Sequence, residues 1–198
     1  RIARYPGGFV FNRNDHRGSW ANFYWQDHIG KNPDRKPTEV YDPDTFLQLC
    51  ERFSIEPLMQ INFVGEKLES VQGYIEYLVG DGAIDKDGVN WAAKRKANGR
   101  DKPYKITYWQ LGNEVHSYAQ GFHENAAGAK EYASALDRFV PVIRKMSPGA
   151  KVLVPFINIQ RPHSEAKLKP DDPDINFTTS HEFAVAFLEH LNVNVDYF

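Results

Sequence analysis

Hydrophobic and polar positions along this chain follow two alternating patterns, one typical of buried strands and one typical of helices. Short apolar runs of strand length occupy residues 58–64, 106–111 and 151–156. The stretches between these runs carry apolar residues at spacings of three and four, the pattern of a helix with one buried face. Strands that alternate with helices in this way favour a parallel sheet covered by helices.

The two patterns together predict five strands and five helices along the chain. The expected strands are 1–5, 58–64, 106–111, 151–156 and 193–198. The expected helices are 43–53, 68–78, 90–97, 132–146 and 179–191.

Local signals mark several helix ends. Asp42 is an expected N-cap, with a proline in the first helical position after it. Gly99 and residues 147–149 follow the third and fourth helices as stop signals. Thr179 and Glu182 have the spacing of a capping box at the start of the last helix.

The fold class follows from these elements and from the absence of a phosphate-binding motif. No helix opens with a glycine-rich loop of Rossmann or P-loop spacing, which argues against an open nucleotide-binding sheet. A complete (β/α)8 barrel needs eight strands and about 250 residues. We therefore expect a single partial TIM-barrel domain over residues 1–198, truncated at both ends and covering the second to sixth strands. Two open sheet edges would favour aggregation or instability of the isolated polypeptide.

Composition and charge narrow the possible partners. The formal net charge is -2 and the basic residues are scattered, apart from Lys94-Arg95-Lys96, which we expect to be a solvated helix face. This distribution argues against nucleic-acid binding. No apolar run reaches membrane-spanning length, so no membrane partner is expected. Cys50 is the single cysteine and falls on the apolar side of an expected helix, where it is interpreted as a core residue.

The strongest chemical signal is the end of the strand at 106–111. Gly112, Asn113 and Glu114 follow it directly. Active sites of (β/α)8 barrels lie at the carboxyl ends of the strands. An amide and a carboxyl group placed there suit an enzyme that protonates a leaving oxygen and holds a neighbouring hydroxyl, as a glycoside hydrolase does.

Aromatic residues and two histidines are weaker candidates for the site. Aromatics make up 14% of the chain. In loops after strands they could stack on sugars, while most are expected to be core residues. His116 and His123 form a weak metal pattern, and a structural or solvent-exposed role is favoured for both. No metal and no organic cofactor are expected.

Three segments carry a resemblance to a known family. They are Arg4-Tyr5-Pro6-Gly7-Gly8 with Trp25-Gln26-Asp27-His28-Ile29-Gly30, then residues 46–51 with 56–62, and last residues 103–114 with Gln120-Gly121. In order and spacing these segments resemble the α-L-arabinofuranosidases of glycoside hydrolase family 51, which belong to a large clan of barrel glycosidases. The Gly-Asn-Glu motif indicates the clan, and the Arg-Tyr-Pro-Gly-Gly motif narrows it toward the family.

The resemblance implies a role for each matching residue. Glu114 matches the general acid/base, and Asn113 matches the residue that bonds the sugar 2-hydroxyl. Arg4 matches the strand-end arginine that keeps the nucleophile ionised, and Trp25 matches a residue of the substrate cleft. The corresponding structural alternatives are a helix cap or surface charge for Glu114, a turn residue for Asn113, a salt-bridging residue for Arg4 and a loop core residue for Trp25.

Some positions depart from the family pattern. Phe9 stands where members often carry Asn or Cys, and residues 115–119 lack a Gly-x-Trp often seen after the acid/base. The family nucleophile is a glutamate after the seventh strand, beyond the strands expected here. Asp196, Glu165 and Glu182 do not match it, so no nucleophile is assigned.

The sequence therefore predicts part of a retaining glycosidase, most consistent with an α-L-arabinofuranosidase acting on arabinose-containing plant polysaccharides or oligosaccharides. The alternatives are another clan member, such as a β-xylosidase or endo-glycanase, and a non-catalytic carbohydrate-binding barrel. By analogy with the family, a homo-oligomer is a possible assembly. Sugar, linkage and compartment stay open at this stage.

Overall fold

The computed structural model describes residues 1–5, 43–61, 68–82, 88–113, 115, 125–155 and 177–198, with side chains omitted for 177–181. The elements in chain order are β1 Ile2–Tyr5, α2 Pro43–Phe53, β2 Glu56–Ile61, α3 Leu68–Val79, α4 Trp91–Ala97, β3 Tyr108–Leu111, α5 Ala126–Met146, β4 Lys151–Leu153 and α6 Phe177–His190. Strands thus alternate with helices, as the sequence pattern predicts.

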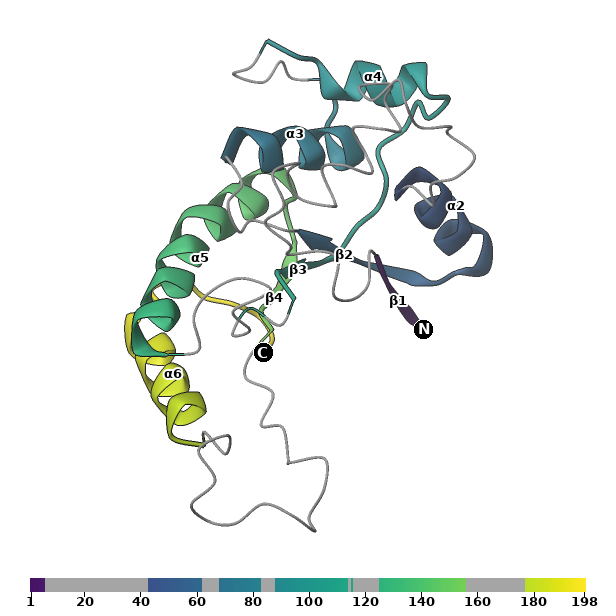
Figure 1. The fold of residues 1–198 in the computed structure, drawn as a ribbon. Helices are drawn as coiled ribbons and strands as arrows, with labels where there is room; N and C mark the ends of the chain where they lie inside the picture. The colour runs from purple at the N-terminus through teal and green to yellow at the C-terminus, as the bar shows by residue number, and fades with distance from the viewer. Residues whose placement is uncertain (6–42, 62–67, 83–87, 114, 116–124, 156–176) are drawn as a thin grey trace, which may run out of the picture.

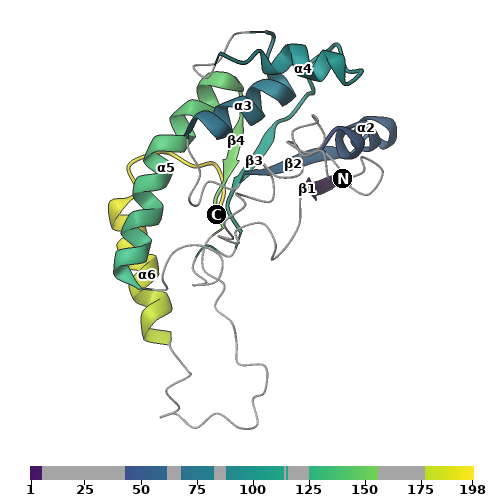
Figure 2. The same ribbon diagram turned by 45° about the horizontal axis from the view of Figure 1, so that its top comes forward.

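The four strands form one parallel sheet in the order β1-β2-β3-β4. The described helices follow one another in an arc on one side of this sheet, from α2 near β1 to α6 beyond β4 (Figures 1 and 2). Sequential parallel strands joined by covering helices are the repeating unit of a barrel wall. The expected α/β class is confirmed at this level, with four described strands.

The sheet has two faces with different contents. Tyr5 stacks on Phe46 of α2 with ring centroids 5.2 Å apart, and the Trp109 indole donates to the Ser147 hydroxyl at the end of α5 over 3.3 Å. These residues point to the helices. Because side chains alternate along a strand and register neighbours share a face, Arg4 and Gln110 belong to the opposite face.

The core between sheet and helices is rich in aromatic residues. Tyr132 of α5 stacks on Phe187 of α6 with centroids 5.1 Å apart, and both rings are fully buried. Cys50 is also buried, so its interpretation as a core residue is confirmed, and burial raises the pKa of its thiol. Apolar burial of this kind is the main term that stabilises the arrangement.

Side chains cap the N-termini of two helices. The Asn90 side chain accepts from the Ala93 amide over 2.7 Å at the start of α4. Asn125 accepts from the Gly128 amide over 2.9 Å at the start of α5. Both satisfy N–H groups that have no partner inside the helix. The expected cap Asp42 lies outside the described residues.

The expected strand at 193–198 is wrong for the described structure. A single bridge between Leu153 and Tyr197 replaces it. The cause is Asp196, whose carboxylate accepts from the Val152 amide over 2.9 Å and so occupies a donor that a strand ladder would use. The final segment still makes backbone hydrogen bonds to β4: the Asp196 amide donates to the Val152 carbonyl over 2.9 Å and the Val154 amide donates to the Tyr197 carbonyl over 3.0 Å. It does not form a strand of the expected length.

The expected solvated face at Lys94-Arg95-Lys96 is wrong for Arg95. Its side chain is fully buried, and its guanidinium donates to the backbone carbonyls of Tyr77 and Gly80 over 2.7 and 2.9 Å. These carbonyls belong to the end of α3 and the residue after it, where acceptors lack intrahelical partners. Arg95 thus joins α4 to the C-terminus of α3.

The expected start of the last helix is also wrong. α6 begins at Phe177, so Thr179 lies inside the helix and does not cap it. The stop signals at the ends of α4 and α5 are confirmed, since Gly99 adopts a φ of 94° and Ser147 caps α5.

Candidate active site

The candidate site is built at the carboxyl edge of the sheet. In a parallel sheet all strands end at the same edge, which places the residues after β1 and β3 near each other. Arg4 is the last residue but one of β1, and Asn113 follows two residues after the end of β3. These are two of the four residues that the sequence analysis assigned to the site.

The structure brings Arg4 and Asn113 together. A guanidinium nitrogen of Arg4 donates to the Asn113 side-chain oxygen over 3.4 Å. Asn113 is 6% exposed, while Arg4 is exposed in the described structure. A charged donor on the amide oxygen orients the Asn113 side chain, because it holds the oxygen on the arginine side.

A glycine turn delivers Asn113 to this position. Gly112 has a φ of 84°, a left-handed conformation that side-chain-bearing residues adopt at a cost. Its amide donates to the Ile61 carbonyl of β2 over 2.9 Å, so the ladder to β2 continues through the turn. The Gly before Asn-Glu in the sequence therefore has a backbone reason.

Two side chains bind the carbonyls of this turn from different elements. Gln110 donates its amide to the Gly112 carbonyl over 2.8 Å. The Tyr132 hydroxyl of α5 donates to the Leu111 carbonyl over 3.2 Å. Burial raises the pKa of Tyr132 well above its usual range, which keeps the hydroxyl protonated as a donor.

Glu114 and Trp25, the other two assigned residues, lie outside the described residues, as do His116 and His123. The neighbours of Glu114 in the chain are described. Asn113 is 6% exposed and Val115 is 1% exposed. The backbone on both sides of the expected acid/base is therefore attached to buried side chains.

The Asp196 carboxylate makes its contacts away from the candidate site. Its carboxylate pairs with Arg144 and Lys151 over 3.0 Å each, in addition to accepting from the Val152 amide. The Val152 amide and the two cations hold the pKa of Asp196 below its usual range. These contacts are structural and agree with leaving Asp196 out of the site.

Other features of the described chain carry no site chemistry. No group of three or more His, Cys, Asp or Glu residues could hold a metal ion within that part of the chain. None of its helices is long and apolar enough to cross a membrane.

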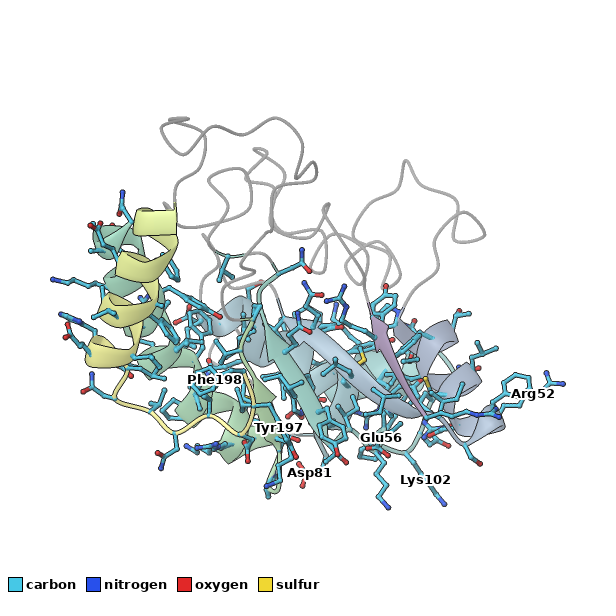
Figure 3. The ribbon with its side chains drawn as sticks, turned by 90° about the horizontal axis from the view of Figure 1, so that it is seen from below. Arg52, Glu56, Asp81, Lys102, Tyr197 and Phe198 are labelled. Carbon is cyan, nitrogen blue, oxygen red and sulfur yellow. The ribbon has the colours of Figure 1, made fainter. Side chains whose placement is uncertain are left out.

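A hollow of about 380 Å³ opens at the amino edge of the sheet. Its lining includes Arg1, Glu56 and Lys105 and contains neither Arg4 nor Asn113. Glu56 begins β2, and Figure 3 shows it along the edge where the strands start. The hollow thus lies at the opposite edge from the candidate site.

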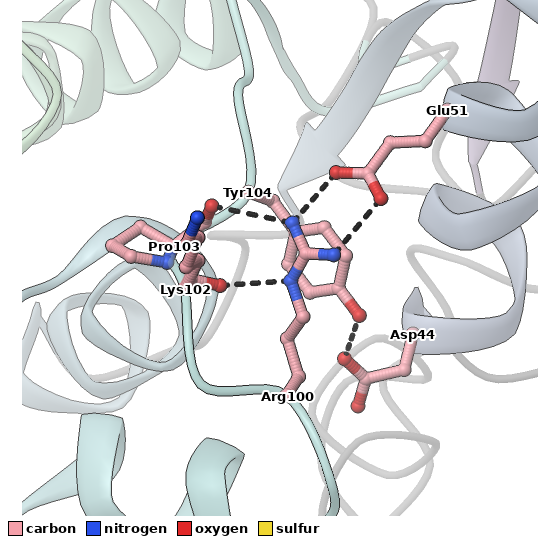
Figure 4. A network of polar contacts seen from close by, with 6 residues as sticks. All are labelled: Asp44, Glu51, Arg100, Lys102, Pro103 and Tyr104. Atoms are coloured by element: carbon pink, nitrogen blue, oxygen red, sulfur yellow. Dashed lines mark hydrogen bonds and ion pairs between the residues drawn. The ribbon is translucent and has the colours of Figure 1, made fainter.

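A polar network holds α2 against the chain that leads into β3 (Figure 4). Arg100 binds both carboxylate oxygens of Glu51 over 2.7 and 2.9 Å and lies 4.4 Å from the centre of the Tyr104 ring. The Tyr104 and Tyr77 hydroxyls donate to the buried carboxylate of Asp44. Burial and this carboxylate raise the pKa of both tyrosines. The network therefore has a structural role, since it joins α2 to residues 100–104.

Sequence reasoning missed Gln110 and Tyr132 as parts of the candidate site. Gln110 could have been suspected, because a polar residue between Trp109 and Leu111 must face away from the helix-covered core. Tyr132 follows the apolar pattern of α5, and nothing in the sequence separates its hydroxyl from that of another core tyrosine.

Comparison with protein families gives one match over nearly the whole chain. A family model described as "Alpha-L-arabinofuranosidase 1 domain" matches residues 1–187. Among curated relatives, a "Probable alpha-L-arabinofuranosidase C" of Aspergillus clavatus is 29% identical over 165 residues. An "Intracellular exo-alpha-(1->5)-L-arabinofuranosidase" of Bifidobacterium longum is 27% identical over 161 residues.

These relatives are longer than this chain. The aligned region covers 77% of this chain and 29% of the Aspergillus clavatus protein, and 76% of this chain and 25% of the Bifidobacterium longum protein. The chain therefore spans between a quarter and a third of the length of these two relatives.

Solved structures agree with the fold. An α-L-arabinofuranosidase of Thermotoga maritima in complex with arabinose superposes with a TM-score of 0.58 at 25% identity, covering 76% of this chain and 30% of that one. The glycoside hydrolase family 51 enzyme of Thermotoga petrophila superposes with a TM-score of 0.59 at 24% identity over 77% of this chain and 30% of that one. The described sheet and helices match part of these structures.

Proposed function

Since this chain belongs to the α-L-arabinofuranosidases of glycoside hydrolase family 51, we propose that it supplies the acid/base half of a retaining α-L-arabinofuranosidase site. The substrates would be arabinose-containing plant polysaccharides or oligosaccharides. The chain spans less than a third of the length of its curated relatives. The activity therefore belongs to the full-length gene product, and the nucleophile is assigned outside this chain.

The observation that carries the proposal is the contact between Arg4 and Asn113. The two residues were assigned to one site from separate motifs, and they meet over 3.4 Å at the carboxyl edge of the sheet. That edge is where barrel enzymes carry out their chemistry. Arabinose in the Thermotoga maritima structure supports a pentose as the bound sugar.

In the proposed mechanism Glu114 is the general acid in the first step and the general base in the second. It protonates the departing glycosidic oxygen while the nucleophile forms a covalent glycosyl-enzyme. It then deprotonates the water that releases the sugar. A retaining pair requires its two carboxyl groups about 5 to 5.5 Å apart, which sets where the nucleophile must lie.

The other assigned residues bind and orient in this proposal. Asn113 hydrogen-bonds the sugar 2-hydroxyl, an interaction that strengthens as positive charge develops on the ring. Arg4 supplies a fixed positive charge that favours the ionised nucleophile. Trp25 forms part of the wall of the cleft. No step in this mechanism uses a metal or an organic cofactor.

The proposal is tested with the full-length gene product on aryl α-L-arabinofuranosides and aryl β-D-xylosides. Cleavage of the arabinofuranosides with retention is the expected result. Preference for the xylosides would instead indicate a β-xylosidase. Binding of oligosaccharides without cleavage of either substrate would indicate a non-catalytic barrel.

Replacement of the acid/base gives the matching residue test. Glu114→Gln is expected to lower kcat about 10²- to 10⁴-fold on substrates with poor leaving groups, because proton donation is lost. The first step should be largely spared on activated aryl substrates, which leave without protonation. Equal loss on both kinds of substrate would contradict the assigned role. Glu131→Gln, an exposed change on α5, is the control.

A further inference from the structure

A buried glutamine on β3 has no role in the mechanism above. Gln110 is 7% exposed and lies on the sheet face that is opposite the helices, the face that also carries Arg4. A buried amide is costly unless it is hydrogen-bonded. Its one described bond goes to the Gly112 carbonyl over 2.8 Å, the carbonyl that directly precedes Asn113.

The bond matters because of the backbone conformation that it holds. Gly112 has a φ of 84°, and its amide is already fixed by the Ile61 carbonyl over 2.9 Å. The Gln110 bond fixes the other end of the same residue. The orientation of the peptide plane between Gly112 and Asn113 determines the direction in which Asn113 leaves the strand.

A second bond fixes the preceding carbonyl. Tyr132 donates to the Leu111 carbonyl over 3.2 Å from α5, on the helix side of the sheet. The turn is therefore held from both faces, by a tyrosine on one and by Gln110 on the other. Two consecutive carbonyls that are bound from opposite sides restrict rotation of the strand end.

We propose that Gln110 is a positioning residue, whose amide holds the Gly112 carbonyl and thereby positions Asn113 at the proposed sugar site. The inference rests on the proposed function and adds a residue to it. Gln110 acts through the backbone and does not touch the sugar. A displacement of about 1 Å in a reacting group can lower a rate about 100-fold. Loss of this one hydrogen bond can therefore lower the rate even where the protein still folds.

The neighbouring strand offers a matched control. Gln60 of β2 is the register partner of Gln110, lies on the same face and is fully buried. Among the residues that the structure describes, neither its amide nitrogen nor its amide oxygen has a hydrogen-bond partner. Gln60→Met and Gln110→Met therefore make the same chemical change at adjacent buried positions, and only the second removes a bond to the turn.

The experiment compares these variants in the full-length gene product on aryl arabinofuranosides of graded leaving-group ability. Gln110→Met should lower kcat on poor leaving groups about 10- to 100-fold, with a smaller loss on activated ones and little change in KM. Gln60→Met should keep the kcat of the unmodified protein. If Gln110 had a structural role only, Gln110→Met would lower the melting temperature, and kcat would depend on the leaving group as it does in the unmodified protein.

Gln110→Asn covers the case in which the methionine variant fails to fold. It keeps a buried amide that is one methylene too short to reach the Gly112 carbonyl, and it should show the same loss. Crystal structures of the variants supply a readout independent of activity, since the Arg4–Asn113 contact should be broken only in the Gln110 variants.

The outcomes separate the two proposals. An unmodified protein that cleaves no arabinofuranoside contradicts the proposed function, while the position of Asn113 in the variant structures still tests the role of Gln110. An active protein whose Gln110 variants keep their kcat and their Arg4–Asn113 contact overturns the inference. Equal losses in the Gln60 and Gln110 variants would overturn it as well.

Discussion

At the scale of single residues, the contact between Arg4 and Asn113 joins two motifs that are 109 positions apart. Asn113 is almost completely buried, and its amide oxygen faces a cation. The proposed contact with the sugar 2-hydroxyl can be tested directly.

Asn113→Ala is expected to lower kcat/KM about 10- to 100-fold on aryl arabinofuranosides, because a hydrogen bond that strengthens in the transition state is lost. The same substitution should have little effect on a 2-deoxy substrate, which lacks the hydroxyl. Steady-state kinetics of both proteins on both substrates measures this coupling. A similar loss on the 2-deoxy substrate would show that Asn113 acts on the fold and not on that hydroxyl.

At the scale of elements, Arg95 joins two consecutive helices by a buried charge. Its guanidinium donates to the carbonyls of Tyr77 and Gly80 at the end of α3. Burial lowers the pKa of Arg95, and the nearby Glu76 opposes that shift. The helix dipole adds to the attraction, because the C-terminus of α3 carries partial negative charge.

Arg95→Met is expected to lower the free energy of unfolding by about 2 to 3 kcal/mol, since it leaves buried carbonyls without donors. Urea unfolding followed by circular dichroism measures the difference. Lys96→Met, an exposed change on the same helix, should alter stability by less than about 0.5 kcal/mol. Similar values for the two variants would contradict the role of Arg95 as a helix cap.

Asp196 joins β4, α5 and the final segment, and it makes stability depend on pH. Its pKa is held below the ordinary value of 3.8 in the folded protein. A carboxylate of this kind stabilises the fold above its unfolded pKa, and the contribution is lost as the pH falls through the folded pKa.

Asp196→Asn should therefore destabilise the protein by about 1 kcal/mol at pH 7. The difference should shrink as the pH falls below about 4 and disappear once the native carboxyl is protonated. Urea unfolding of both proteins across this range checks the sign. Glu131→Gln controls for the loss of one negative charge at an exposed site. A difference that stays constant with pH would contradict the assignment.

At the scale of the whole molecule, the described sheet ends in β1 on one side and β4 on the other. β4 is bridged at Leu153 by Tyr197, while β1 carries the exposed side chain of Ile2, 62% accessible. Phe198 is 63% accessible near the other edge. Unpaired strand edges with apolar side chains favour association between copies.

The isolated polypeptide of residues 1–198 is accordingly expected to associate as its concentration rises. Sedimentation velocity at several concentrations measures this association. Ile2→Lys should reduce it, because a charge on an edge strand disfavours edge-to-edge pairing. A polypeptide that stays monomeric at all concentrations would show that the edges are protected.

Much of the architecture could be predicted because it rests on local patterns. The helices α2, α3 and α4 lie within one or two residues of their expected bounds, since the spacing of apolar residues reports which face is buried. The strand at 193–198 could not be predicted correctly. The alternating residues there are compatible with a strand, and the competition of Asp196 for the Val152 amide depends on a contact with β4.

The candidate site divides in the same way. The motif around Asn113 and the glycine before it are visible in the sequence, and Glu114 and Trp25 remain predictions outside the described residues. Gln110 stands inside that motif, yet its hydrogen bond to the Gly112 carbonyl depends on the backbone conformation of the turn. The burial of Arg95 was missed because one basic residue in a run of three looks like its neighbours in the sequence.

The sequence by itself determined the alternation of strands and helices, the family, and the residue types that reach the carboxyl ends of β1 and β3. Periodicity and motif order depend on residues that are near one another in the sequence, so they can be recognised without knowledge of the fold. Tertiary structure decided which atoms meet: the pairing of Arg4 with Asn113, the capping of α3 by Arg95, and the binding of the β3 turn from both faces. These choices depend on register and packing between segments that are distant in sequence, because a hydrogen bond forms only within about 0.5 Å of its preferred length.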